Sequence, residues 1–242
     1  MIRTVVGVTF IALIIVFILP FLIFYTWISG SADFMFEMAM KSLRVFLRIV
    51  GVRVRAEGAE NIPARPCVFV SNHVSNLDPP ALVPYIPRRV AILAKKEVFR
   101  IPILSIGFHQ VGVIPVDRGG GFRVAASVDA AIQALRNGRS FLVFAEGTRS
   151  RDGRLRRFKN GTFLMAIRAG AAVVPVSLIG TQRLMRKGEW YIRPGEVVVR
   201  FAQFVDAAEY SLDRREQLRN RVHELVAENL PPDQAPSGSS EV

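Results

Sequence analysis

The sequence is poor in the residues that build disulfides and metal clusters. Its 242 residues include one cysteine, Cys67, and three histidines. A single cysteine excludes an intrachain disulfide and any zinc site that needs two or more thiolates. Three histidines are too few for a histidine-rich metal cluster. We therefore expect a reduced chain without a structural metal.

Acidic residues are also scarce relative to basic ones. Lys and Arg total 32 against 20 Asp and Glu, so the formal net charge is +12 and the isoelectric point is near 10.9. This balance favours an anionic partner such as phosphate, nucleic acid or anionic lipid. With 50% hydrophobic residues, only 21% charged residues and a mean hydropathy of +0.29, the chain is neither disordered nor collagen-like. Its length suits one domain and a little more.

The first long segment without charge runs from Val5 to Ile28. At about 1.5 Å per residue, a helix of this length matches a hydrocarbon core of roughly 30 Å, which predicts a membrane segment. A cleaved signal peptide is the alternative, but its apolar core is usually only about 7–15 residues long. Pro20 interrupts the segment and removes one helical hydrogen bond, so a bent or re-entrant helix is as consistent with the sequence as a straight span.

Charged residues return between Ser31 and Val50 with the spacing of a single helical stripe. The stripe consists of Asp33, Glu37, Lys41, Arg44 and Arg48. This pattern predicts a helix in the membrane interface with its basic residues toward lipid headgroups. The alternative is that the helix packs on the soluble domain, and the two are compatible. A hairpin of both helices within one leaflet would keep the N-terminus and the basic domain on the cytoplasmic side. A single span would place the N-terminus outside.

Beyond Gly51, short apolar runs alternate with helical stretches, which is typical of an α/β domain. Asn137-Gly138 ends one predicted helix, and Leu218 to Val226 mark a C-terminal amphipathic helix. We expect a mixed, mostly parallel sheet flanked by helices, preceded by an N-terminal membrane-embedded two-helix element. The predicted units are a membrane anchor over residues 1–50, a catalytic domain over 51–230 and a disordered tail over 231–242. The expected strands are Val52–Arg55, Cys67–Ser71, Val90–Leu93, Val113–Val116, Phe141–Phe144, Val173–Leu178 and Val197–Phe201.

The segment CVFVSNHVSNLDPP combines a base with a carboxylate after an apolar strand. Asn72 and His73 follow the strand, and Asp78 precedes Pro79. A histidine at such a strand end can accept a proton from a hydroxyl, and a nearby carboxylate can fix its tautomer and stabilise the imidazolium. The simpler interpretation is that Asp78 caps a helix that has Pro79 in its first turn. The motif by itself is weak.

A second loop, FAEGTRS, also follows an apolar strand and is suited to an anion. Gly147 permits close backbone approach, Thr148 offers a hydroxyl and Arg149 offers a planar guanidinium, so the turn predicts a phosphomonoester site. Glu146 is expected to orient an arginine or a substrate hydroxyl. The alternative is a solvated basic loop. In a third loop, GVIPVDRGGG, Arg118 is a further candidate phosphate ligand, but the loop lacks the Lys-Ser/Thr of a P-loop.

Together these residues resemble the lysophospholipid acyltransferases of the bacterial 1-acylglycerol-3-phosphate acyltransferase type. Asn72-His73 with Asp78 is similar to the N-H-x4-D motif of that family, and Phe144–Ser150 is similar to its F-P-E-G-T-R-S block, with Ala145 in place of the usual proline. Gly112–Arg118 resembles the second block, Val174-Pro175-Val176 the fourth, and Lys95-Lys96-Glu97 with Pro102 the lysine segment of the family.

The resemblance implies a direct acyl transfer. His73 would be the general base that deprotonates the free hydroxyl of 1-acylglycerol 3-phosphate, and Asp78 would hold it. The acceptor would attack acyl-CoA or acyl carrier protein and yield phosphatidic acid. The residues implied in phosphate binding are Arg118, Gly147, Thr148 and Arg149, with Lys95 as a helper, and the supporting residues are Asn72, Glu146 and Pro175. Cys67 lies in a predicted strand and is expected in the core.

We expect no cofactor and no metal, since the acyl thioester is a co-substrate. The expected partners are lysophosphatidic acid, anionic headgroups and the acyl donor, without nucleic acid, and the expected location is the cytoplasmic face of the inner or plasma membrane. Three alternatives stay open: another acceptor such as glycerol 3-phosphate, another lysophospholipid or a lyso-aminolipid; a thioester hydrolase; or a non-catalytic basic protein of the membrane surface or of nucleic acid. The last would leave His73 and Asp78 unexplained. Donor type, chain length and oligomeric state are not determined by the sequence.

Overall fold

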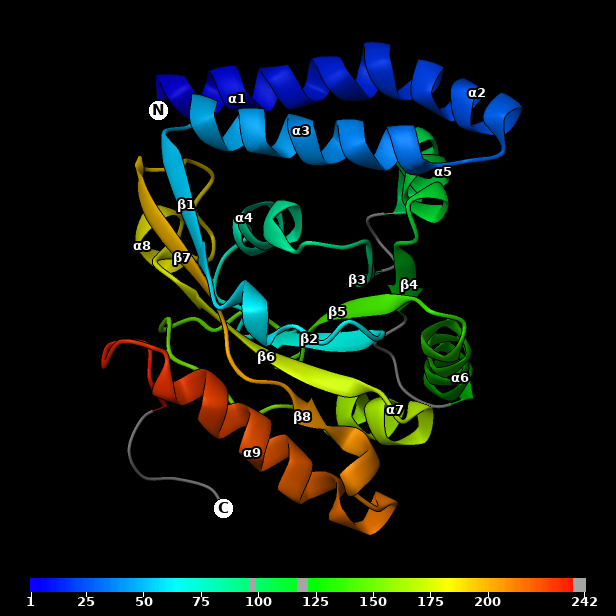
Figure 1. The fold of residues 1–242 in the computed structure, drawn as a ribbon. Coiled ribbons are helices and arrows are strands. Elements are labelled where there is room, and N and C mark those ends of the chain that lie inside the picture. Colours follow the sequence, from blue (N-terminus) through cyan, green and yellow to red (C-terminus); the bar gives the residue numbers. More distant parts are fainter. Residues whose placement is uncertain (96–98, 117–121, 237–242) are drawn as a thin grey trace.

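A computed structural model describes residues 1–95, 99–116 and 122–236 of the chain (Figure 1). Its helices are α1 (Ile2–Leu13), α2 (Leu19–Ser29), α3 (Asp33–Ile49), α4 (Asp78–Leu82), α5 (Pro102–Gln110), α6 (Phe122–Arg136), α7 (Gly161–Ala169), α8 (Thr181–Leu184) and α9 (Arg215–Glu228). Its strands are β1 (Val52–Glu57), β2 (Cys67–Ser71), β3 (Val90–Lys95), β4 (Ile114–Val116), β5 (Ser140–Phe144), β6 (Ala172–Ile179), β7 (Gly195–Phe201) and β8 (Val205–Asp206).

The strands form one mixed sheet in the order β1-β7-β6-β2-β5-β3-β4, with β8 paired to β6. All pairs are parallel except β6 with β7 and β6 with β8. The seven predicted strands are present. Strand β8 was not predicted, because two residues are too short to show a period. The expected mixed, mostly parallel sheet is confirmed.

Helices cover both faces of this sheet, which explains why β2 is apolar from Cys67 to Val70. In β2, Phe69 joins a core cluster with residues of α3 and α4, whereas Val68 and Val70 join a second cluster with residues of α6, α7 and α9. Alternate residues of a strand point to opposite faces, so a strand covered on both sides has apolar residues on both of its faces. All five residues of β2 are buried.

Helices α1 and α2 form one apolar rod that crosses Pro20 without a break. A π-helical turn, Ile14–Ile18, joins them just before the proline. Proline cannot donate a backbone hydrogen bond, and its ring crowds the carbonyl four residues earlier; the wider π turn relieves both conflicts. Ile2–Ser29 is long and apolar enough to cross a membrane. The chain then reverses at Gly30, which has a φ of +67°, and α3 returns beside the rod (Figure 1).

Helix α3 packs between the apolar rod and the α/β domain. Phe46, Leu47 and Val50 at its C-terminal end belong to the core of the domain. Two members of its predicted charged stripe also bond to that domain: Arg44 Nη2 donates to the carbonyl of Pro84, and Asp33 pairs with Arg89 at 2.7 Å. Arg44 therefore faces the domain and not lipid headgroups, and the alternative of packing on the domain is confirmed for α3.

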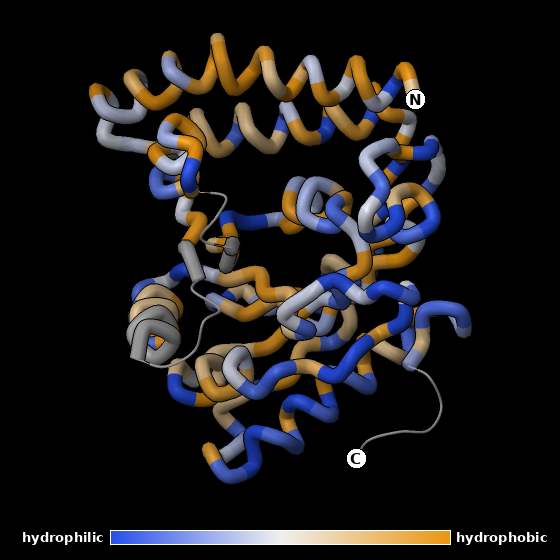
Figure 2. Tube along the Cα trace, turned by 180° about the vertical axis from the view of Figure 1, so that it is seen from behind, coloured by the Kyte–Doolittle hydropathy of each residue, from blue (hydrophilic) through white to orange (hydrophobic). Residues whose placement is uncertain are grey.

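The apolar rod is fastened to the domain at two separated points. Near its start, the hydroxyl of Thr4 donates to the carbonyl of Ile192 at 3.3 Å and accepts from the amide of Ile192 at 2.9 Å. Near its middle, Leu19 lies against Gly107 of α5, where a Cβ would approach Leu19 Cδ1 to 3.1 Å. Its outer surface stays exposed and apolar, as the hydropathy colouring of Figure 2 shows.

The segment after Pro231 differs from the predicted disordered tail over the part that the structure describes. Gln234 is completely buried, and its carbonyl accepts from the amide of Leu155 at 2.8 Å. Arg183 also pairs with Asp233 at 2.7 Å. A proline-rich composition disfavours helices and strands, but it is compatible with a turn that is ordered by contacts with the rest of the domain. Residues 237–242 lie outside the described part of the chain.

Candidate active site

The candidate residues gather at one edge of the sheet because they follow parallel strands. Strands β2 and β5 are neighbours, and Ser71 at the end of β2 pairs with Phe144 at the end of β5. The carboxyl ends of parallel strands meet at one edge, where ligands of open α/β sheets bind. The loop with His73 and the loop with Arg149 therefore emerge side by side. The amide of Ser150 donates to the carbonyl of His73 at 2.8 Å and ties the two loops together.

His73 is held on three sides. Its Nδ1 lies 2.8 Å from Oδ2 of Asp78, its ring stacks on Phe144 with 4.3 Å between centroids, and its backbone amide donates to Glu146. About 17% of its side chain remains exposed, so the ring is accessible at one edge. Since Asp78 takes the Nδ1 position as a hydrogen-bond acceptor, the imidazole is oriented with Nε2 away from Asp78.

Asp78 is completely buried and acts on the loop, not on its helix. Its Oδ2 also accepts from the amides of Val74 at 2.7 Å and Ser75 at 2.8 Å. Asp78 occupies the first turn of α4 next to Pro79, as expected, but its carboxylate caps no helical amide. The turn from Val74 to Leu77 thus brings the carboxylate of Asp78 to the ring of His73. Within a regular helix, side chains five residues apart would point in different directions.

Asn72 fixes this loop to the centre of the sheet. Its side chain donates to the carbonyl of Leu178 at 2.9 Å and accepts from the amide of Leu178 at 2.8 Å. The amide group therefore continues the pairing of β2 with β6 where the backbone leaves the strand. Pro175 lies three residues earlier in β6, paired with Val70, and supports the same strand. Asn72 is a positioning residue for His73.

Glu146 makes a contact that the sequence did not predict. Its Oε1 accepts from the backbone amide of His73 at 2.8 Å, and the residue is only 4% exposed. Burial raises the pKa of Glu146 to about 8; the amide of His73 lowers it and the charge of Asp78 raises it further. The sequence missed this role because a contact with a backbone amide leaves no motif.

The pKa of Glu146 gives a test of stability against pH. Between about pH 4.5 and 8 the folded protein keeps a proton that the unfolded chain releases, so stability falls as pH rises, by up to about 1.4 kcal/mol per pH unit. Glu146→Gln stays neutral and still accepts from His73. We expect its unfolding temperature, measured in detergent across this range, to decline less steeply than that of the wild type. Parallel curves for both proteins would contradict the protonated carboxyl.

The FAEGTRS loop forms the predicted tight turn. Gly147 has a φ of +75°, a conformation that favours glycine, and a Cβ at this position would lie 2.7 Å from Cε of Lys159. Thr148 is exposed and Arg149 is half-buried. Within the described residues, no acceptor lies within hydrogen-bond reach of the buried Nη1 of Arg149. A buried guanidinium nitrogen without an acceptor is costly and is typical of an anion site.

Two lysines that no motif singled out add to this positive charge. Lys159 lies over Gly147, and Nζ of Lys187 donates to the carbonyl of Arg149 at 2.8 Å. The pKa of Lys187 is lowered by desolvation and by the charges of Arg151, Arg149 and Arg156. Like charges held together favour an anionic ligand. Lys159 belongs to the basic run that follows the loop, whereas Lys187 carries no sequence signal.

Two candidates are only partly placed. Lys95 is the last residue of β3 and pairs with Val116 of β4, so both strands end at the same sheet edge as β2 and β5. The side chain of Lys95 and all of Arg118 lie outside the described part of the chain.

Cys67 is completely buried, as predicted, and burial raises the pKa of its thiol. Ser75 serves the turn, because its hydroxyl donates to the carbonyl of Met185 at 2.6 Å.

Comparison with known proteins agrees with this geometry. Residues 53–179 match the family model described as Acyltransferase. The 1-acyl-sn-glycerol-3-phosphate acyltransferase of Borreliella burgdorferi is 31% identical over 196 residues, which cover 81% of this chain and 78% of that protein. The chain belongs to the 1-acyl-sn-glycerol-3-phosphate acyltransferase family. The protein of that name from Limnanthes douglasii is also 31% identical, over 79% of this chain and 68% of its own.

A solved structure supports the same assignment. The crystal structure of the 1-acyl-sn-glycerophosphate acyltransferase PlsC from Thermotoga maritima superposes with a TM-score of 0.79 at 30% sequence identity. The match covers 93% of this acyltransferase and 92% of that chain, so it extends beyond the α/β domain. The fold class predicted from the sequence, including the helical element before the sheet, is therefore shared with a structurally characterised relative.

Proposed function

We propose that this acyltransferase moves a fatty acyl group from an acyl thioester to the free hydroxyl of 1-acylglycerol 3-phosphate and forms phosphatidic acid. The observation that carries the proposal is the pairing of His73 Nδ1 with buried Asp78 at 2.8 Å, beside a turn that presents Arg149. A base and an anion site on neighbouring loops match an acceptor that has a hydroxyl and a phosphate on one glycerol.

The chemistry requires one proton acceptor and no covalent enzyme intermediate. Nε2 of His73 takes the proton of the acceptor hydroxyl as its oxygen attacks the thioester carbonyl carbon. The carbon–sulfur bond then breaks, and the thiolate leaves with the proton from His73. Asp78 stabilises the imidazolium between these steps. Cys67 is buried in β2, and Ser71 donates within the Asn72 turn, so neither is placed as a nucleophile.

The phosphate is proposed to lie at the Gly147 turn. Gly147 allows the backbone to approach closely, and Arg149, Lys159 and Lys187 surround the turn with positive charge. A guanidinium binds a phosphomonoester with two parallel hydrogen bonds, which also orients it. Thr148 is exposed next to these groups and offers a hydroxyl. Lys95 and Arg118 are proposed as further ligands from the adjacent strand ends, on the resemblance alone.

The apolar rod supports an anchor within one membrane leaflet. Because Thr4 and Leu19 fasten the rod to the domain at two separated points, it lies along the domain instead of leaving it perpendicularly. Its outer face, which includes Val5, Phe17 and Phe24, is exposed and apolar. We propose that this face lies in the cytoplasmic leaflet, which places the sheet edge at headgroup depth, where an acceptor with one acyl chain presents its hydroxyl.

A transfer assay tests the activity. Purified protein in detergent is given labelled acyl-CoA with or without 1-acylglycerol 3-phosphate, and thiol release and labelled phosphatidic acid are measured. We expect both to depend on the acceptor. Thiol release with free acid and no acceptor would instead favour a thioester hydrolase. The same assay identifies the acceptor when glycerol 3-phosphate or other lysophospholipids replace 1-acylglycerol 3-phosphate. It identifies the donor when acyl carrier protein replaces CoA as the carrier of the acyl group.

The phosphate site has its own test. Arg149→Ala is expected to raise KM for 1-acylglycerol 3-phosphate by about tenfold to a hundredfold with a smaller change in kcat, because it removes a charge-assisted contact worth about 1.5–3 kcal/mol. Arg221→Ala is a matched control, since this arginine lies on α9 and pairs with Glu224. An unchanged KM in Arg149→Ala would place the phosphate elsewhere.

A further inference from the structure

We propose that the loop from Met185 to Pro194, between α8 and β7, is a second membrane contact, in which Trp190 inserts into the interface of an anionic bilayer. The proposal rests on the membrane placement of the apolar rod given above. No motif singled out this loop. It is called the 185–194 loop below.

The 185–194 loop is a built structure that presents an exposed tryptophan. Trp190 is 58% exposed. Next to it, Arg193 binds Glu189 through two hydrogen bonds of 2.6 and 2.9 Å and lies 4.5 Å from the ring centroid of Tyr191. These bonds, with the amide of Arg186, lower the pKa of Glu189 to about 2. The ring is held exposed on a well-bonded loop, so its apolar surface is available for burial against a membrane.

The loop is continuous with the start of the apolar rod. Ile192, two residues after Trp190, exchanges both backbone hydrogen bonds with the hydroxyl of Thr4. The two opposite views agree that the chain between α8 and β7 reaches the beginning of α1 (Figures 1 and 2). Val5, the residue after Thr4, and Val8, one helical turn after Thr4, are both exposed. Tryptophan is enriched at membrane interfaces, where its ring sits at headgroup level beside an apolar segment.

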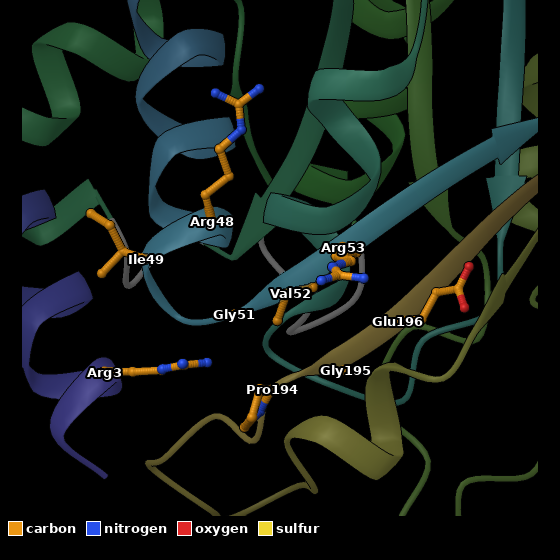
Figure 3. A pocket seen from close by; sticks show the side chains of 9 residues that line it. All are labelled: Arg3, Arg48, Ile49, Gly51, Val52, Arg53, Pro194, Gly195 and Glu196. Atoms are coloured by element: carbon orange, nitrogen blue, oxygen red, sulfur yellow. The ribbon is translucent and has the colours of Figure 1, made fainter.

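Charge complementarity supplies the second argument for a bilayer. A cavity of about 740 Å³ opens where α1, α3, β1 and the end of the loop meet, and Arg3, Arg48 and Arg53 line it (Figure 3). In the part of the chain that the structure describes, none of these arginines has a carboxylate within 4 Å, and Glu196, which also lines the cavity, lies 3.6 Å from Arg55. Three arginines in a cavity that Pro194 at the end of the loop also lines suit the phosphates of anionic headgroups.

The loop also connects this surface to the catalytic loops. The carbonyl of Met185 accepts from the hydroxyl of Ser75, and Lys187 donates to the carbonyl of Arg149. One segment of ten residues therefore bonds to the His73 loop, to the phosphate turn and to the first turn of the membrane helix. Insertion of Trp190 would fix the depth of the sheet edge relative to the headgroups.

Because the chain has only two tryptophans, Trp27 and Trp190, reciprocal single-tryptophan proteins test the proposal. Trp27→Phe reports Trp190 alone, and Trp190→Phe reports Trp27 of the rod. Both rings are exposed, so neither change removes buried packing. Each protein is mixed with phosphatidylcholine–phosphatidylglycerol vesicles, with and without bromine on the acyl chains near the carbonyl, and fluorescence emission is recorded.

We expect a blue shift and quenching by brominated lipid for both tryptophans. Quenching of Trp27 with no response of Trp190 would overturn the second contact and leave the anchor intact. No response of either would contradict the membrane placement as well.

In a second measurement, Trp190→Ser is expected to reduce co-sedimentation with the anionic vesicles about tenfold. The double variant Arg3→Gln with Arg53→Gln is expected to weaken co-sedimentation with anionic but not with zwitterionic vesicles. Equal binding of all variants to both vesicles would overturn the proposal.

Discussion

Replacement of His73 by alanine is expected to lower kcat by about 10²–10⁴-fold, the range that a general base contributes. Its Nδ1 is held by Asp78 at 2.8 Å and its ring stacks on Phe144, so a single nitrogen is left for the substrate. KM for the acceptor should change little, because the phosphate turn does not depend on the imidazole. The measurement is acceptor-dependent thiol release at saturating acyl-CoA.

His109→Ala is the matched control. This histidine is exposed on α5, its Nδ1 contacts the carbonyl of Ser105 at 2.7 Å, and it has no place in the proposed mechanism. Its turnover should equal that of the wild type. Equal turnover of His73→Ala and His109→Ala would show that another group accepts the proton.

Asp78→Asn is expected to lower kcat by at least about 10²-fold while the protein stays folded. The amide oxygen of asparagine can still accept from Val74 and Ser75, so the buried loop keeps its hydrogen bonds. With its oxygen in the place of Oδ2, the amide can still accept from Nδ1 of His73, but the negative charge that stabilises the imidazolium is lost. Turnover and the unfolding temperature in detergent are measured together.

Asp78→Ala provides the contrast. It leaves the amides of Val74 and Ser75 buried without their acceptor, at a cost of about 1–3 kcal/mol for each unsatisfied group. We expect it to lower the unfolding temperature, whereas Asp78→Asn should lower mainly turnover. If Asp78→Asn retained full turnover with a normal unfolding temperature, the carboxylate would have only a structural role.

The sequence predicted the elements well where the signal is local. The apolar runs located seven strands, and Asn137-Gly138 ended α6 where expected, because alternation and turn residues act over a few positions. The same local evidence failed for Gln234, which is buried and whose carbonyl accepts from the amide of distant Leu155. Composition indicates the conformation that an isolated segment prefers. It does not indicate which distant residues pack against that segment in the folded protein.

The candidate site shows the same division. His73, Asp78 and Arg149 were identified from residue type and order, since a strand followed by a polar loop has a recognisable pattern. The contacts of Glu146 and Lys187 with backbone groups were not predicted. Glu146 binds a backbone amide 73 residues away and Lys187 binds a carbonyl 38 residues away, and backbone groups are identical in every sequence.

By itself, the sequence determined the apolar N-terminal segment, the alternating α/β elements and the presence of a base, a carboxylate and a basic phosphate loop. The tertiary structure alone decided that β2 and β5 are neighbours and that the apolar rod lies along the domain. It also decided that the 185–194 loop bonds to the catalytic loops and to the apolar rod. The physical reason is range. Propensity and periodicity act between neighbours in the chain, whereas strand order, burial and the convergence of charges arise only when distant segments pack together.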